Sequence, residues 1–437
     1  MPSEQTFFGT SWLLPQDEET FDGSTLTNFL VQLATAVTQN VVNVRLSPYN
    51  AQGDGVTDDT SVIQAALTAA GEATYGGTVF LPAGDYRVDS LEIPDTARVR
   101  LLGEGPGITT ITQRTSISGS ANLLENATGG AGIGPIVENM TLTGAADDSG
   151  GHTVYLQDVT GSIFRNLHLS TAGSAQALFR IFTGVTQVWC DNLRLTGGGA
   201  KHGLWFGRSL SGLTRPSEIW VSNFGSWGLS SGDGFDAGHA VFLDDVKHVR
   251  LTGGRLTGLE CPAAAVQIQD GAWDVHFENF QATFQSSEAA VFVIDDSRGI
   301  SMTDCVAGDA ANATTALALS DVQTLHFERG VVTGTSVTVD SDCTDIHFRG
   351  TEIDDDVSIT GSGATRDIVH CEGCVEVDDA GAYASAFGTL NEALIPTKSD
   401  SNRGAAGIAG RVIFNSDDGQ LNVDDGTNWT LPDGTTT

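Results

Sequence analysis

The stretch that decides the fold is Ile136–Gly144, IVENMTLTG, because its pattern returns along most of the chain. Residues 162–170 read SIFRNLHLS, and residues 188–197 read VWCDNLRLTG. Each copy has a short alternating apolar segment, one turn-forming residue and a second alternating segment. Aligned on the turn-forming residue, the copies fall 21–31 residues apart. The ten aligned positions are Asn139, Asn166, Asn192, Asn223, Gly253, Asn279, Asp304, Arg329, Gly350 and Glu372.

These repeats predict coils of short strands stacked on one another. Alternation of apolar and polar residues is typical of strands, and Asn, Gly and Asp are typical of the turns between them. No repeat holds an apolar stripe long enough for a helix, and the Leu-x-x-Leu-x-Leu spacing of leucine-rich repeats is absent. A period near 25 residues therefore favours a parallel β-solenoid. Ten coils at about 4.8 Å each would span about 50 Å. We interpret the recurrent asparagines as turn residues whose amides bond along the stack, not as ligands.

Residues 50–88 carry a family resemblance. They contain GDGVTDD at 53–59, an apolar-faced helix predicted over 60–70, and GGTVFLPAGDYRV at 76–88. This combination resembles the first segment of the pectate-lyase superfamily of right-handed parallel β-helices, which includes polygalacturonases, pectate lyases and many viral tailspikes. The resemblance implies a helix that covers the open end of the first coil. We expect Asp58 or Asp59 to cap this helix, and we expect Asp54 to stabilise the fold and to take no part in catalysis.

The charge balance is extreme. The chain has 437 residues and 55 acidic against 21 basic side chains, a formal net charge of −34. Asp outnumbers Glu by 38 to 17, and only 3 of the 21 basic residues are Lys. Such a surface repels nucleic acid and anionic lipid, so neither is an expected partner, and no apolar run is long enough to insert in a membrane. The Asp surplus and Lys scarcity resemble those of halophilic archaeal proteins, which work in salt that screens like charges.

The two ends differ from the repeats. We predict an N-terminal docking or oligomerisation segment at 1–45, a β-helix at 46–380, a linker at 381–410 and a C-terminal β module at 411–437. The first residues lack the basic and apolar regions of a secretory signal. The last segment reads as three strands with Asp-Gly turns and resembles small β modules of phage tail fibres. The sequence implies no cofactor firmly; Ca²⁺, Mg²⁺ or Na⁺ at acidic surface clusters is the open alternative.

Two longer repeats point to a glycan-binding surface. Their additional residues fall in 197–218 and 225–245, and insertions in solenoids form loops, often on a binding face. Aromatic rings stack on sugars and guanidinium groups bind carboxylates or sulfates, so an anionic or neutral glycan is the expected ligand. For Trp189 and Trp220, which occupy repeat positions, packing in the core is the alternative. The predicted glycan-binding residues are Trp205, Trp227, Lys201, His202, Arg208 and Arg215.

Catalysis is a second hypothesis for the same region. Glycoside hydrolysis uses two carboxylates about 5–10 Å apart. The candidate catalytic residues are Asp233, Asp236, His239, Asp244, Asp245 and Glu260. The phrase DAGHAVFLDD at 236–245 resembles polygalacturonase elements only faintly. The Asn-Thr-Asp and Arg-Ile-Lys elements are missing, and the paired acids follow the histidine where the family has them before it.

Three functions fit this sequence. The first is a spike or fibre on the virion surface of a virus of a halophilic archaeon, acting as a homotrimer. It would bind a host glycan or glycoprotein, and contact other virion proteins through its N-terminal segment. The second is a glycoside hydrolase or polysaccharide lyase, viral or extracellular. The third is a purely structural capsid or tail decoration protein.

Overall fold

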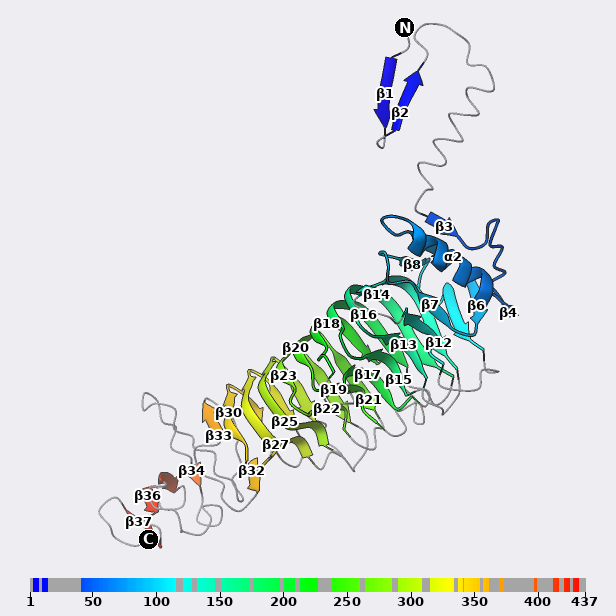
Figure 1. The fold of residues 1–437 in the computed structure, drawn as a ribbon. Helices are drawn as coiled ribbons and strands as arrows, with labels where there is room; N and C mark the ends of the chain where they lie inside the picture. The colour runs from blue at the N-terminus through cyan, green and yellow to red at the C-terminus, as the bar shows by residue number, and fades with distance from the viewer. Residues whose placement is uncertain are drawn as a thin grey trace.

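The repeats form a parallel β-solenoid, as Figure 1 shows for this computed structural model. Within the described residues its strands build three stacked faces, named here A, B and C. The structure describes the chain outside residues 1–2, 8–9, 15–40, 115–120, 128–131, 146–150, 173–175, 197–199, 209–212, 227–237, 260–263, 285–289, 309–314, 334–336, 341, 354–356, 361–368, 373–396, 399–411, 416–419, 425–426 and 432–437.

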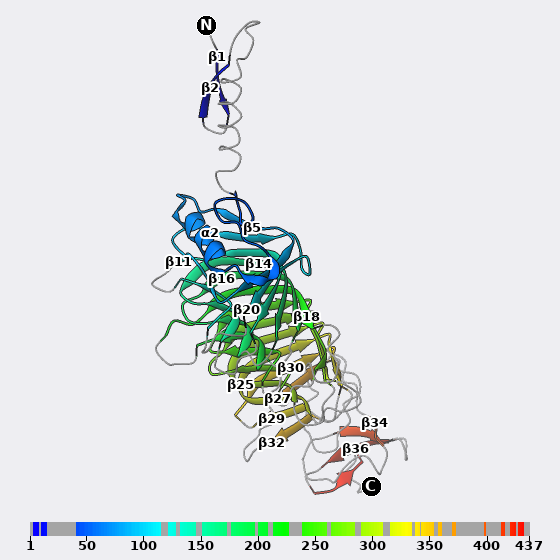
Figure 2. The same ribbon diagram turned by 90° about the vertical axis from the view of Figure 1, so that its right-hand side faces the viewer.

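Each face is a ladder of parallel strands from successive coils (Figure 2). Face A consists of β7 (Leu91–Ile93), β10 (Leu124–Asn126), β13 (His152–Leu156), β15 (Ala177–Ile181), β17 (His202–Gly207), β19 (Val241–Asp244), β22 (Val266–Gln269), the first parts of β25 (Ala290–Thr303) and β27 (Thr315–Glu328), β29 (Val337–Asp340) and β32 (Val357–Thr360). Face B consists of β3 (Val41–Asn43), β5 (Thr78–Leu81), β8 (Arg100–Gly103), the first parts of β12 (Ile136–Gly144), β14 (Val159–Thr171), β16 (Thr186–Thr196) and β18 (Ser217–Ser226), then β20 (Lys247–Thr252), β23 (Trp273–Glu278), the second parts of β25 and β27, β30 (Thr344–Arg349) and β33 (Val369–Glu372).

Face C completes each coil. It consists of β4 (Asp54–Asp58), β6 (Gly84–Val88), β9 (Thr109–Gln113), the second parts of β12, β14, β16 and β18, then β21 (Arg255–Leu259), β24 (Gln281–Phe284), β26 (Val306–Gly308), β28 (Val331–Thr333) and β31 (Glu352–Ile353). The short β11 (Gly132–Ile133) pairs with the start of β14.

The corner between faces B and C is formed by the predicted turn residues. Nine of the ten aligned positions have positive φ, from 49° at Asn279 to 65° at Gly253. Asn166 donates its amide to Asn139 Oδ1 at 2.9 Å and accepts one from Asn192 at 2.9 Å. The predicted asparagine ladder is therefore confirmed for these three residues. Glu372 was misaligned by one position, because it lies in β33 and pairs with Arg349, the residue before the turn.

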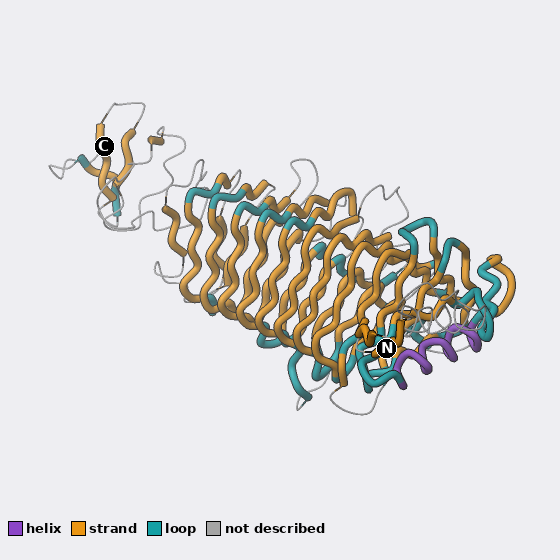
Figure 3. Tube along the Cα trace, turned by 90° about the horizontal axis from the view of Figure 1, so that it is seen from above, coloured by secondary structure: helices purple, strands orange, loops and turns teal. Residues whose placement is uncertain are grey.

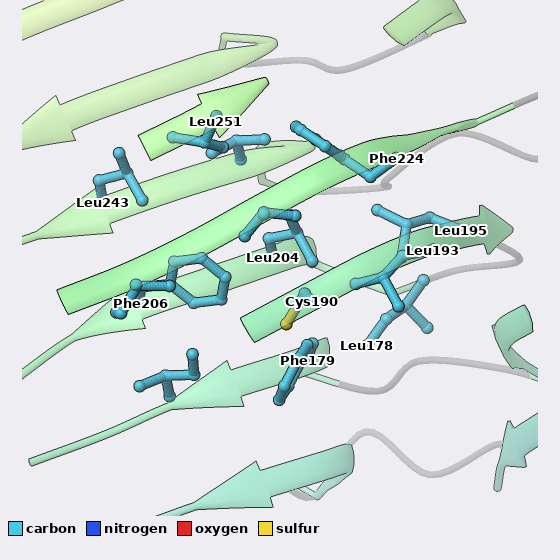
Figure 4. Close-up of a cluster of buried hydrophobic side chains, with 14 of the residues drawn as sticks. Leu178, Phe179, Cys190, Leu193, Leu195, Leu204, Phe206, Phe224, Leu243 and Leu251 are labelled. Carbon is cyan, nitrogen blue, oxygen red and sulfur yellow. The ribbon is translucent and has the colours of Figure 1, made fainter. Parts of the chain in front are cut away.

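The core fills the inside of the coils with equivalent side chains from neighbouring strands (Figure 4). Phe179 and Phe206 occupy successive coils of face A, with ring centroids 6.1 Å apart. Cys190, Cys305 and Cys343 are buried free thiols and pack as small core residues. Because the alternating residues point inward in every coil, the intervening side chains of each face point to solvent.

The helix α2 (Thr60–Glu72) covers the first coils, as Figure 3 shows. Its buried face includes Ile63, Ala66 and Leu67, in agreement with the predicted apolar face. Asp59 holds the N-cap position, but its carboxylate accepts the backbone N–H groups of Gln52 and Gly53 at 2.7 and 2.9 Å. The expected side-chain cap by Asp59 was therefore wrong. Asp58 contacts the first turn instead, accepting the N–H of Thr60 at 3.0 Å.

Two small sheets lie outside the solenoid ladder. The sequence did not predict the antiparallel hairpin of β1 (Ser3–Phe7) and β2 (Thr10–Leu14). The predicted C-terminal β module is present as β35 (Val412–Asn415), β36 (Gln420–Asp424) and β37 (Trp429–Thr430). The short β34 (Thr397–Lys398), within the predicted linker, pairs with β35. Residues 15–40 of the predicted N-terminal docking or oligomerisation segment lie outside the described residues. None of the described helices is long and apolar enough to cross a membrane.

Candidate functional site

A row of large side chains runs along the outer surface of face A. Tyr155, Arg180, Trp205 and Phe242 occupy the same register position on β13, β15, β17 and β19. Their strand neighbours point into the core, so this row points outward. Tyr155, Trp205 and Phe242 are partly exposed, whereas Arg180 is only 2% exposed. We call these four residues the aromatic row.

Arg180 is held inside the row by aromatic rings. Its Cζ lies 3.8 Å from the ring centroid of Trp205 and 5.0 Å from that of Phe182. Such cation–π contacts strengthen when the cation is shielded from water. Burial lowers the pKa of Arg180 to about 9, so the group keeps its charge at neutral pH. The row therefore has one fixed positive charge between its aromatic residues.

Three histidines flank the aromatic row. The His202 ring stacks on Phe242, with centroids 5.0 Å apart, and lies 4.9 Å from the Trp205 ring. His239 stacks on His202 at 5.5 Å, and its backbone N–H donates to His202 Nδ1 at 3.3 Å. His152 lies two coils earlier, 6.1 Å from Trp205 by ring centroids. Together they extend the row into a continuous surface of planar groups.

The histidines are neutral at physiological pH. Burial, with a smaller effect of Arg180, lowers the pKa of His152 to about 3. Burial also lowers the pKa of His202 to about 3 and lowers that of His239. A neutral imidazole offers one hydrogen-bond donor and one acceptor, which suits a hydroxyl-bearing ligand. Groups with such shifted pKa values gather at functional sites more often than elsewhere.

Two polar atoms at this surface are buried without a partner. His152 Nδ1 and Trp205 Nε1 have no hydrogen bond within the described part of the chain. Each such atom costs about 1–3 kcal/mol of stability. A surface built only for packing would avoid this cost, so their presence favours a functional role for the row.

Asp244 lies at the end of β19, two residues after Phe242. It is 7% exposed, and its pKa is raised to about 7. Burial is the largest cause, and the hydrogen bond to Asp270 and the charge of Asp270 raise the pKa further, whereas the charge of Arg180 lowers it. Asp244 is thus partly protonated at neutral pH. Its direct hydrogen bond to Asp270 makes this pair too close for the carboxylate spacing of about 5–10 Å in glycoside hydrolases.

Asp245, the next residue, forms the corner between faces A and B with a φ of 53°. Its carboxylate is 6% exposed and pairs with the guanidinium groups of both Arg208 and Arg215. Arg208 also donates to the carbonyl of Leu213. The two ion pairs of this carboxylate tie Arg208 and Arg215 to the corner after β19.

The structure brings some of the predicted residues together and separates others. Trp205, His202 and His239 meet at the aromatic row, and Lys201 precedes His202 at the start of β17. Arg208, Arg215 and Asp245 form the separate corner cluster. Asp244 lies between the two groups. Four predicted residues fall outside the described residues: Trp227, Asp233, Asp236 and Glu260.

Trp189 and Trp220 do not fill the core. They lie on face B, and their rings stack with centroids 5.2 Å apart and planes 8° apart. Trp189 is 42% exposed. The core interpretation was wrong because Val188 and Cys190, its strand neighbours, already occupy the inward positions.

Sequence reasoning missed several members of the site. Tyr155, Arg180 and Phe242 were not predicted, nor was the Asp270 partner of Asp244. The sequence held part of the evidence for these residues, since Tyr155, Arg180 and Trp205 follow one another at intervals of 25 residues, which is the length of one coil. The insertion before Phe242 lengthens the next interval, so the spacing does not extend to that residue. Among the described residues, no group of three or more His, Cys, Asp or Glu side chains is placed to hold a metal ion.

Comparison with known proteins agrees with the fold. Residues 41–146 match the family model described as rhamnogalacturonase A/epimerase, pectate lyase-like, so this part is a pectate-lyase-like domain. Mannuronan C5-epimerase AlgE1 of Azotobacter vinelandii is 45% identical over 76 residues, 16% of this chain and 5% of that protein. AlgE4 of the same organism is 36% identical over 120 residues, 25% of this chain and 21% of that protein. The chain thus spans a small part of these relatives.

Solved structures with a similar fold include viral proteins. ORF18 of Geobacillus virus E2 has a TM-score of 0.48 at 15% identity, over 82% of this chain and 68% of that one. Tailspike protein 3 of bacteriophage CBA120 has a TM-score of 0.40 at 12% identity, over 98% of this chain and 78% of that one.

Proposed function

We propose that this chain binds a surface glycan through the aromatic row and acts as a spike or fibre protein on a virion. The observation that carries the proposal is the row itself. Trp205 and Phe242 lie in register on adjacent strands of face A, flanked by neutral His202 and His239. Sugar rings combine an apolar face with polar hydroxyls, and this surface offers a partner for each.

The charge of the surroundings supports selective recognition. The chain has a net charge of −34, yet the row presents neutral rings and the Arg180 cation. In molar salt the long-range repulsion by the acidic surface is screened, so short-range stacking on the rings and hydrogen bonding at the row select the ligand. A glycan with exposed hydroxyls fits this combination better than a nucleic acid or a lipid.

The biological setting is part of the proposal. The Asp-rich, Lys-poor composition supports a halophilic source, and a β-helical rod followed by a separate C-terminal sheet suits a fibre. We therefore place the chain on the virion surface of a virus of a halophilic archaeon. In this proposal the chain is a homotrimer, residues 1–45 contact other virion proteins, and the ligand is a host glycan or glycoprotein.

The test is binding to envelope glycans of haloarchaeal cells in molar KCl, measured by titration calorimetry. Trp205→Ala removes the central ring and is expected to weaken binding about tenfold or more. Trp189→Ala is the matched control, because it removes an exposed tryptophan from face B. Equal affinities of the wild type and Trp205→Ala would refute the row as the binding surface. Thermal melting of both variants checks that each remains folded.

A carbohydrate-active enzyme is the second candidate. The pKa of Asp244, near 7, suits a group that donates a proton at neutral pH, and the matched relatives are named as mannuronan C5-epimerases and an alginate lyase. Incubation with host exopolysaccharide in molar salt would give new reducing ends or unsaturated uronates. Loss of these products in Asp244→Asn, but not in Asp304→Asn at the corner between faces B and C, would favour the enzyme over the binding protein.

A further inference from the structure

A row of apolar side chains runs along the outer surface of face B. Ile136, Ile163, Trp189 and Trp220 occupy one register position on β12, β14, β16 and β18. None of the four is buried, and Trp189 is 42% exposed. We call these four residues the face B stripe. A contiguous apolar patch with a polar rim is typical of a contact surface.

The two tryptophans of the face B stripe cover each other's ring faces. Their rings stack with centroids 5.2 Å apart and planes 8° apart. The register places Ile163 beside Trp189 and Arg250 beside Trp220, on the outer sides of this stack. Sugar rings stack on open aromatic faces, whereas a protein surface also packs against ring edges and aliphatic side chains. The stripe therefore fits a protein partner better than a glycan.

The charges that border the face B stripe balance one another. The border consists of the residues two positions before and after each stripe residue, with the register neighbours at the two ends of the stripe. It holds three acids and three bases, whereas the whole chain holds 55 acids and 21 bases. Glu138 bridges two of the arginines, with nitrogen–oxygen distances of 2.6 and 2.9 Å. Two copies of a chain with a net charge of −34 repel each other, and contact is least opposed where the charges balance. The charged border residues are Glu138, Asp191, Glu218, Arg100, Arg165 and Arg250.

Face B is large enough for contact between copies. A stable interface covers about 800 Å² on each partner. A strand of six residues, such as β20, covers about 20 Å by 4.8 Å, so about eight neighbouring strands of face B supply this area. The stripe runs along the middle of the face, since Trp189 lies between Thr186 and Asp191 in the face B part of β16. A three-fold axis along the rod brings equal residues of three copies to the same height, so apolar residues meet apolar residues.

We propose that copies of this chain pack against one another through face B, with the face B stripe at the centre of the contact. The inference rests on the homotrimer of the proposed function and adds the surface that holds it together. Interface centres are typically rich in Trp and poor in unpaired charge, as the stripe is. Face A lies on another side of each coil, so its aromatic row stays accessible in every copy.

The first experiment measures the mass in molar KCl by light scattering. The wild type is expected at three times the 45.6 kDa of one chain. Trp189→Glu places an unpaired charge at the centre of the contact and is expected to give single chains. Val331→Glu is the matched control, since it replaces an outward apolar side chain of face C, and it should remain trimeric. Melting followed by circular dichroism checks that both variants fold.

The outcomes separate the stripe from the homotrimer. A Trp189→Glu protein as trimeric as the wild type would overturn the stripe as the contact and leave the homotrimer standing. A wild type that is a single chain at all concentrations would overturn both, while glycan affinity still tests the aromatic row.

The second experiment maps the contact by cross-linking. Packed sheets lie about 10 Å apart, so a bis-maleimide linker of about that length should join the new thiols of two Trp189→Cys copies. Val331→Cys should give only the background of the wild type, and equal cross-linking of the two variants would overturn the stripe. Each copy has its own aromatic row, so Trp189→Ala should keep the affinity per chain for a short oligosaccharide. Loss of that binding with an unchanged trimer would assign the stripe to the glycan and overturn the proposal.

Discussion

Replacement of Asn166 separates the two contributions of the asparagine ladder to stability. Asn166 makes two amide hydrogen bonds of 2.9 Å, one to Asn139 and one from Asn192, and its φ is 53°. Asn166→Gly keeps access to the left-handed conformation but removes both bonds. At about 1 kcal/mol net for each bond, it should lower the free energy of unfolding by about 2 kcal/mol.

Asn166→Ala adds a second cost. Alanine lacks the short polar side chain that lets Asn adopt the left-handed conformation, which costs about 1–2 kcal/mol, so the total loss should be about 3–4 kcal/mol. Gly253 holds the equivalent corner with a φ of 65° and has Asn223 Oδ1 only 3.3 Å from where a Cβ would lie. Gly253→Asn is therefore the converse variant and should add one ladder bond at a small conformational cost.

The assay is urea unfolding in molar KCl, followed by circular dichroism. Stacked coils contribute roughly additively, so variants at one corner shift the unfolding midpoint of the whole rod. The expected order of stability is wild type, Asn166→Gly, then Asn166→Ala. Equal stability of the wild type and Asn166→Gly would show that the ladder bonds contribute nothing. Equal stability of the two variants would refute the conformational argument.

Three further predictions concern charge. The pKa of Asp244 is about 7 in the folded state and lies near its ordinary value in the unfolded state, so protonated Asp244 stabilises the fold at low pH and this stabilisation is lost as pH rises through 7. Asp244→Asn should reduce the fall in melting temperature between pH about 4 and 8. Arg208→Met leaves the buried Asp245 with one cation and should cost about 3 kcal/mol, part of which Arg208→Met/Asp245→Asn should restore in the same unfolding assay. Raising KCl from about 0.1 M to about 1 M shortens the Debye length from about 10 to about 3 Å and screens the repulsion between acidic side chains. The melting temperature should therefore rise, and an unchanged melting temperature would contradict the halophilic interpretation.

The corners of the rod were predictable because turn chemistry is local. Asn139 and Gly253 mark left-handed positions through their own side chains, without reference to distant residues. The hairpin of β1 and β2 was not predicted, since its strands have no turn signal of the Asn-Gly or Asp-Gly kind between them. The side-chain role of Asp59 also depended on tertiary contacts, because the N–H groups that it accepts come from a loop that precedes the helix.

The site was predictable only in part, because strand register decides which residues meet. The insertions and tryptophans directed attention to Trp205 and His202, whose rings the structure places 4.9 Å apart. Tyr155 and Arg180 come from earlier coils without insertions, and only the register aligns them with Trp205. The alternative that Trp189 packs in the core stayed open in the sequence, because a one-residue change of phase exchanges the two sides of a strand. Arg180 is buried by rings from neighbouring coils, which composition alone does not indicate.

A crystal structure of the chain with a bound envelope oligosaccharide would test the aromatic row most directly. The account predicts sugar rings against Trp205 and Phe242 on face A, with hydroxyls at His202 or His239. A ligand seated on the Trp189–Trp220 stack of face B, with face A unoccupied, would contradict it.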